Sequence, residues 1–140
     1  RITVEVEEGG RALIRVTDNG CGMTPSEAVL SLQRHATSKI SRAEDLAAVR
    51  TLGFRGEALP SIASVSRLTL TTCPRGETEG VRLEAEAGEI VSLEPAPAVE
   101  GTVFTVRDLF YNTPARLKFL KTVRTELGQI CDAVSRVALS

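Results

Sequence analysis

Short segments in which apolar and polar residues alternate recur along this chain, and they constrain its fold more than any other feature. Alternation with a period of two is typical of β-strands that have one covered face. Several of these segments follow one another through short turns, which favours hairpins and a mixed, largely antiparallel sheet. We also expect a short strand at 90–93, followed by a loop at 95–97. The alternating segments are residues 2–6, 12–16, 68–72, 81–85 and 102–106.

Helical signals lie between these segments. Thr24 is a good N-cap, with Pro25 at the first helical position and Glu27 three residues after the cap, so we expect a helix from there to about Arg34. Shorter helices are expected at about 41–49 and directly after Gly56. The sequence therefore predicts an α/β (α+β) two-layer sandwich in which helices cover the sheet.

Two further helices are expected near the end of the chain. Asn112 and Thr113 should cap the first of them, which begins at Pro114. The second carries one apolar stripe that includes Cys131, so we interpret this cysteine as a core residue. The stripe consists of Leu127, Ile130, Cys131, Val134 and Ala138.

Composition limits the classes of protein to consider. The 140 residues are 42% hydrophobic and 25% charged, as in an ordinary globular domain, and the net charge of −1 excludes a globally basic nucleic-acid binder. The three cysteines lack the spacing of a zinc site or a disulfide framework. No apolar run reaches membrane-spanning length, so we expect no membrane association and a cytoplasmic location. Because a strand begins directly after Arg1, we expect residues 1–140 to be a single partial domain of a longer protein.

Asp18 is the first candidate functional residue. It shares strand parity with Ile14 and Val16 and should point toward the covered face, where a carboxylate needs hydrogen-bond donors. Thr102 is likewise a polar residue on the apolar face of its strand, with Phe104 and Val106. Each residue alone also has a simpler interpretation, which is turn chemistry for Asp18 and β-propensity for Thr102.

Two further segments are typical of phosphate binding. Gly53 and Gly56 precede a helix, and unpaired N–H groups at a helix N-terminus attract anions. The chain from His35 to Leu52 is a long, mostly polar crossing with hydroxyls and a lysine, in which residues 36–40 are expected to form a loop, and such a crossing suits a lid over a ligand. The alternative for the two glycines is a plain turn, and the alternative for the polar crossing is a solvated surface loop.

The order of these features resembles the ATP-binding domain shared by DNA gyrase, heat-shock chaperones, histidine kinases and MutL, known as the GHKL or Bergerat fold. Four blocks are most similar to the MutL family of mismatch-repair ATPases, and they extend over essentially the whole chain. A gyrase subunit or a histidine kinase is disfavoured because the third and fourth of these blocks are MutL-like. The blocks are residues 18–22, 34–40, 52–59 and 108–116.

The resemblance implies a role for each candidate residue. Asp18 would accept a hydrogen bond from the adenine amino group, and Thr102 would support the same base, often through water. Gly20 and Gly22 would leave room for the base and sugar, and Leu30 would meet the nucleotide from the first covering helix. The ATP lid would comprise Thr37, Ser38 and Lys39. The phosphate-binding loop and helix entrance would comprise Gly53, Phe54, Arg55, Gly56, Glu57, Ala58 and Leu59.

The resemblance also implies ATP and Mg²⁺ as cofactors of a slow ATPase. The family's general-base glutamate and its magnesium-binding asparagine precede the strand that begins at Ile2, so we expect this piece to hydrolyse little ATP. Catalytic and metal-binding residues are therefore expected outside the chain. The implied location is the bacterial cytoplasm, at the nucleoid, or a eukaryotic nucleus.

The implied partners are a MutS-type mismatch-recognition protein, a second copy or a paralogue in a dimer driven by ATP, and DNA bound without sequence preference. The basic residues from Arg107 to Arg124 could contact DNA phosphates, although a solvated helix face explains them equally well. Two other functions stay open. One is a paralogue that binds ATP as a switch without turnover, and the other is a protein-binding module that uses no nucleotide.

Overall fold

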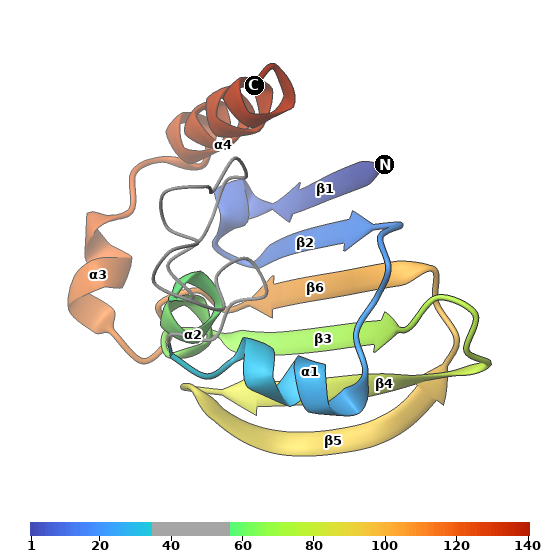
Figure 1. Cartoon of the computed structure of the whole chain (residues 1–140). Helices are drawn as coiled ribbons and strands as arrows, with labels where there is room; N and C mark the ends of the chain where they lie inside the picture. Colours follow the sequence, from blue (N-terminus) through green and yellow to red (C-terminus); the bar gives the residue numbers. More distant parts are fainter. Residues whose placement is uncertain (35–56) are drawn as a thin grey trace, which may run out of the picture.

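The computed structural model describes residues 1–34 and 57–140 of the chain. Its described strands form one six-stranded sheet in the order β1-β2-β6-β3-β4-β5, and all five pairings are antiparallel (Figure 1). The predicted two-layer fold with a largely antiparallel sheet is thus confirmed. The strands are β1 (Ile2–Glu7), β2 (Leu13–Asp18), β3 (Arg67–Cys73), β4 (Glu79–Glu86), β5 (Glu89–Pro97) and β6 (Gly101–Arg107).

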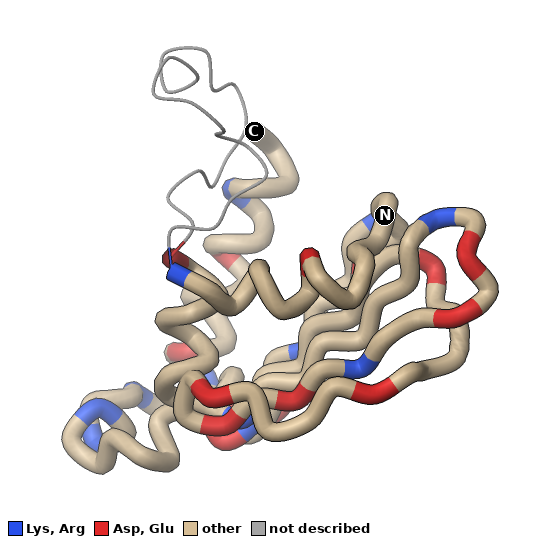
Figure 2. The backbone as a smooth tube through the Cα atoms, turned by 60° about the horizontal axis from the view of Figure 1, so that its bottom comes forward, with Lys and Arg blue, Asp and Glu red and all other residues tan. Residues whose placement is uncertain are grey.

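The described helices follow the predicted order along the chain. Figures 1 and 2 agree that α1 and α2 lie over one face of the sheet, whereas α3 and α4 lie beside it. None of the described helices has both the length and the apolar character required to cross a membrane. The helices are the 3-10 turn η1 (Glu8–Gly10), α1 (Pro25–Ser31), α2 (Ala58–Ala63), α3 (Pro114–Phe119) and α4 (Val123–Ala138).

The strand register places the apolar residues of the alternating segments on the helix-covered face. Leu70 lies opposite Phe104 on one side and Leu83 on the other, and two residues along the strand Leu68 lies likewise between Val106 and Ala85. Ala28 of α1 and Ala63 of α2 are almost completely buried against these residues. The core therefore lies between the sheet and the first two helices, which is why the predicted parity could identify inward-facing positions.

Helix α1 begins as its sequence indicates. Thr24 Oγ1 accepts a hydrogen bond from the Glu27 N–H at 3.3 Å, and the Glu27 carboxylate accepts one from the Thr24 N–H at 2.8 Å. The pKa of the Glu27 carboxyl group is lowered by its hydrogen bonds to Thr24. The bond to the Thr24 backbone has the larger effect, and the bond to the Thr24 side chain has the smaller one. The helix ends at Ser31, earlier than the expected Arg34.

The predicted loop at 95–97 is wrong, because β5 continues through Pro97. Pro95 lies opposite Val81 and Pro97 lies opposite Glu79. Among the described strands β5 pairs only with β4, so it forms one edge of that sheet. An edge strand tolerates proline because only one of its sides exchanges hydrogen bonds with a neighbouring strand. The expected short strand at 90–93 is part of this longer one.

Two expectations about the last helices are also corrected. Pro114 begins α3, but the structure gives Thr113 no side-chain capping bond, and Asn112 donates instead to the Ser64 carbonyl oxygen at 2.9 Å. In α4 the structure leaves Cys131 exposed, so this cysteine is not a core residue among the described residues. Among the described elements the helix packs mainly against η1, and Ile130 is the one residue of the apolar stripe that is partly buried.

Candidate functional site

Asp18, Thr102 and Thr72 form one row across three neighbouring strands. Asp18 ends β2 opposite Thr102 in β6, and Thr102 lies opposite Thr72 near the end of β3. Paired residues of an antiparallel sheet share a face, so all three side chains lie on the helix-covered side. The inward orientation predicted for Asp18 and Thr102 is therefore confirmed. Thr72 is fully buried, Thr102 is 4% exposed, and Asp18 is partly exposed.

Asp18 is held by the turn that follows it. The Gly20 N–H donates to Asp18 Oδ1 at 2.8 Å, which is the local turn chemistry that the sequence offered as the simpler interpretation. Among the described residues, no group donates to the second carboxylate oxygen, Oδ2. The turn thus fixes the carboxylate while leaving one oxygen available to a ligand.

Thr72 is the residue that sequence reasoning missed. Its Oγ1 lies 3.0 Å from Thr102 Oγ1 and 3.2 Å from the Gly101 carbonyl oxygen, and it accepts a hydrogen bond from the Met23 N–H at 2.9 Å. This hydroxyl therefore joins β3, β6 and the loop before α1. The signal was present in the sequence, because Thr72 follows Leu68 and Leu70 with the same parity that singled out Asp18 and Thr102.

Backbones approach each other closely around this row, and glycines permit it. Gly22 has a φ of +70°, and a Cβ added there would lie 1.8 Å from the Cys73 carbonyl oxygen. Gly101 has a φ of +78°, and its Cβ would lie 2.1 Å from the Asp18 carbonyl oxygen. These two positions admit only glycine, because both the backbone angle and the neighbouring backbone exclude a side chain.

The other predicted site residues fall into two groups. Leu30 is half exposed on α1, and Ala58 and Leu59 form the first turn of α2, directly after Glu57. The structure thus confirms that a helix begins directly after the predicted loop, at Ala58. The remaining predicted residues lie outside the described part of the chain, and they are Thr37, Ser38, Lys39, Gly53, Phe54, Arg55 and Gly56.

A second cluster holds the opposite end of β3. Arg67 donates to Asp108 Oδ2 at 2.8 Å, lies 3.5 Å from the Glu86 carboxylate, and stacks over the Tyr111 ring at 4.2 Å. The Asp108 hydrogen bond is the main cause of the raised pKa of Arg67. The Phe110 N–H donates to the Val65 carbonyl oxygen at 2.7 Å, so this cluster fixes the loop after β6 against the end of α2.

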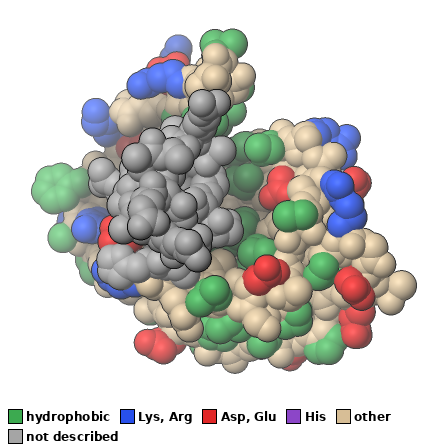
Figure 3. Space-filling model, in the orientation of Figure 1, with side chains coloured by type: hydrophobic (Ala, Val, Ile, Leu, Met, Phe, Trp, Pro, Cys, Tyr) green, Lys and Arg blue, Asp and Glu red, His purple; other side chains and the backbone are tan. Residues whose placement is uncertain are grey.

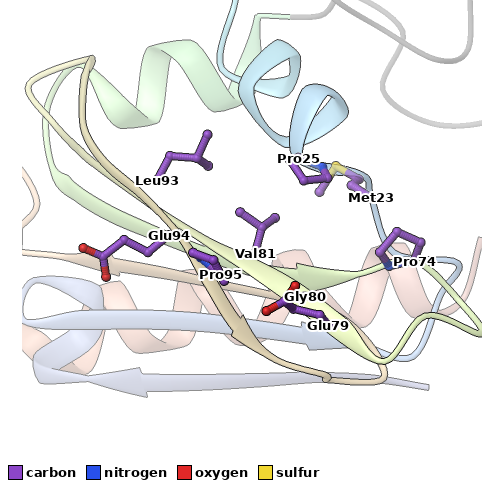
Figure 4. Close-up of a pocket in the computed structure, with 9 residues that line it drawn as sticks. All are labelled: Met23, Pro25, Pro74, Glu79, Gly80, Val81, Leu93, Glu94 and Pro95. Carbon is purple, nitrogen blue, oxygen red and sulfur yellow. The ribbon is translucent and has the colours of Figure 1, made fainter.

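An apolar groove of about 270 Å³ lies nearer the edge formed by β4 and β5. Figure 4 shows Met23, in the loop before α1, and Pro25, at the start of α1, opposite Val81 and Leu93 of the sheet, with Pro74 beside Met23. None of the predicted site residues that the structure describes lines this groove, although its lining residue Val81 lies opposite Thr72 and continues the Asp18 row toward β5. Its lining residues are Met23, Pro25, Pro74, Glu79, Gly80, Val81, Leu93, Glu94 and Pro95.

Comparison with known proteins connects this geometry to a class. The chain is 35% identical to the structure titled Aquifex aeolicus MutL ATPase domain complexed with ADP, with a TM-score of 0.71 over 99% of this chain and 47% of that one. It is 30% identical to the N-terminal domain of a DNA repair protein, with a TM-score of 0.74 over 95% of this chain and 38% of that one. The antiparallel sheet, its covering helices and these likenesses define a GHKL-type ATPase fold.

Sequence comparison narrows the class. The chain is 58% identical over 139 residues to MutL of Geobacter sulfurreducens and 60% identical over 140 residues to MutL of Symbiobacterium thermophilum. These matches cover 99% and 100% of this chain, but only 23% and 22% of those proteins. No protein-family profile matches the chain. Over the part that it covers, the chain belongs to the MutL family of DNA mismatch repair proteins.

Proposed function

We propose that residues 1–140 form part of a single ATP-binding domain and carry most of its adenine-recognition surface, within a MutL-type mismatch-repair ATPase. The observation that carries the proposal is the Asp18 row, in which a carboxylate on the covered face keeps Oδ2 available beside Thr102. An adenine amino group is a hydrogen-bond donor of the kind that such an oxygen accepts. The ADP-bound Aquifex aeolicus relative supports a nucleotide as the ligand.

The other proposed nucleotide contacts follow the resemblance. Gly20, Gly22 and Leu30 would surround the base and sugar from the loop before α1 and from α1 itself. The start of α2 at Ala58 supports the predicted phosphate site, because its first N–H groups have no partners within the helix. The lid residues 37–39 and the phosphate-binding loop 53–56 complete the proposal.

Hydrolysis is proposed to need residues beyond this chain. Among the described residues, no group of three or more His, Cys, Asp and Glu side chains could hold a metal ion. In the family resemblance, the general base and the metal ligand precede Ile2. We therefore propose slow, Mg²⁺-dependent turnover in the complete protein and little or none in the 140 residues alone. Phosphate release from the two proteins, measured side by side, tests this difference.

The partners are proposed for the complete protein. ATP binding would drive dimerisation of its N-terminal regions, and the dimer would transmit a signal from a MutS-type mismatch-recognition protein to downstream repair on DNA. The bacterial origin of the similar MutL proteins supports a location in the cytoplasm, at the nucleoid. Sedimentation with and without a non-hydrolysable ATP analogue would test dimerisation, and an unchanged monomer would refute it.

Calorimetric titration with a non-hydrolysable ATP analogue tests the adenine proposal. The complete protein should bind the analogue, and Asp18→Asn should weaken binding at least about tenfold, because a hydrogen bond to a charged acceptor is lost. Asp132→Asn, on the exposed surface of α4, is the matched control and should leave affinity unchanged. Equal binding by the Asp18 variant and the unmodified protein would refute the adenine role of Asp18. Undetectable binding by the unmodified protein would favour the module that uses no nucleotide.

A further inference from the structure

The three contacts of the Thr72 hydroxyl determine where its proton points. A hydroxyl has one proton to donate and two lone pairs that accept. The Met23 N–H occupies one lone pair, and the Gly101 carbonyl oxygen can only accept, so its contact uses the Thr72 proton. The contact with Thr102 must then use the second lone pair of Thr72. All three bonds form together only if Thr102 is the donor in this pair.

This arrangement also fixes the polarity of Thr102. Its proton is directed at Thr72, so the oxygen presents lone pairs toward Asp18, its neighbour in the row. The Asp18 carboxylate offers only acceptors as well. Because Thr72 is fully buried, no water competes for its hydroxyl, and the assignment is held by the protein itself.

We propose that Thr72 is a positioning residue that makes the Asp18–Thr102 edge an all-acceptor surface and so selects the base of the nucleotide. Adenine carries an amino group at C6, whose two N–H groups are donors, whereas the oxo bases carry an acceptor oxygen there. An edge of two acceptors can accept hydrogen bonds from the N–H groups of the adenine amino group, whereas it repels the oxygen of an oxo base. This inference rests on the proposed adenine site and extends it from affinity to base specificity.

The test compares a non-hydrolysable ATP analogue with the matching inosine triphosphate analogue, in which an oxygen replaces the C6 amino group. Both are titrated into the complete protein by calorimetry. The unmodified protein should prefer the adenine analogue. Thr72→Val keeps the shape of the side chain but frees the Thr102 proton to turn toward the base, so it should reduce this preference about three- to tenfold. Thr72→Ser retains the hydroxyl and should therefore retain the preference for the adenine analogue.

Thr71→Val is the matched control, because Thr71 neighbours Thr72 in β3 but lies on the opposite face of the sheet. It should leave the preference unchanged. If Thr72→Val does not fold, Thr102→Val provides the same test, since it removes one of the two acceptors and should lower the preference similarly.

The outcomes separate this inference from the proposed function. Equal weakening of both analogues by Thr72→Val would mean that Thr72 only supports the fold, and it would overturn the inference. Full preference in Thr102→Val would overturn it too. Unmodified protein that binds both analogues equally would refute base selection while leaving nucleotide binding intact, whereas protein that binds neither would refute both.

Discussion

At the residue scale, the candidate site depends on backbones that approach one another more closely than a side chain allows. Gly22 lies against the last residue of β3, Cys73, and Gly101 lies against the last residue of β2, Asp18. The fold therefore requires glycine at both positions, whether or not a ligand is bound. The resemblance assigned Gly22 to ligand clearance. The geometry adds that this residue fixes the loop on which Met23 contacts Thr72.

Gly22→Ala should destabilise the fold by about 2 kcal/mol or more, since it adds an unfavourable positive φ and a clash with the Cys73 carbonyl group. Gly76→Ala is the matched control, because Gly76 also has a positive φ but has no atom within 4 Å of an added Cβ. That variant should lose only about 1 kcal/mol. Denaturant unfolding of both measures the difference, and equal losses would contradict the close approach.

At the element scale, the confirmed predictions are those that depend on a few neighbouring residues. The capping box at Thr24 and the alternation of β3, β4 and β6 could be recognised because their causes lie within each segment. The full length of β5 could not be predicted from its own residues, because its prolines are tolerated through its position at the edge of the sheet. The exposure of Cys131 depends on what packs against α4, which periodicity does not report.

The α1 capping box should make stability depend on pH. The pKa of Glu27 is lower in the folded chain than its ordinary value of 4.5, so the charged form stabilises the fold above that value. This contribution is lost as the pH falls through the lowered pKa. Glu27→Gln removes the titration, so the stability advantage of the unmodified chain at pH 7 should shrink steadily below about pH 4.5.

Thermal unfolding of the two chains between pH 7 and pH 3 measures this effect. Glu94→Gln, at an exposed position on β5, is the control and should show no comparable convergence. A constant difference between the unmodified chain and Glu27→Gln across this range would mean that the carboxylate charge is not what holds the helix start.

At the scale of the whole molecule, the alternation of the strands predicted most of the architecture, and parity predicted two of the three residues in the Asp18 row. Thr72 was missed because its role comes from contacts with β6 and the loop before α1, which only the assembled sheet brings together. The family resemblance supplied the ligand, which no single segment could identify. The lid and the phosphate-binding loop stay predictions, because they lie outside the described residues.

The basic residues near the end of the chain allow a test of DNA contact. Arg116, Lys118, Lys121 and Arg124 are exposed on and between α3 and α4, and Lys and Arg side chains gather over α4 in Figure 3. If these residues contact DNA phosphates, Lys118→Ala combined with Lys121→Ala in the complete protein should weaken the salt dependence of DNA binding. The slope of the logarithm of the binding constant against the logarithm of the salt concentration should fall in magnitude by about two. An unchanged slope in a DNA-binding titration would refute this contact.

The most direct measurement of the central claim is a crystal structure of the complete protein with a non-hydrolysable ATP analogue. The adenine amino nitrogen should lie within about 3 Å of Asp18 Oδ2, with the base next to Thr102 and the phosphates at the start of α2. Adenine in the apolar groove beside Leu93 and Pro95, or anywhere away from the Asp18 carboxylate, would contradict the account.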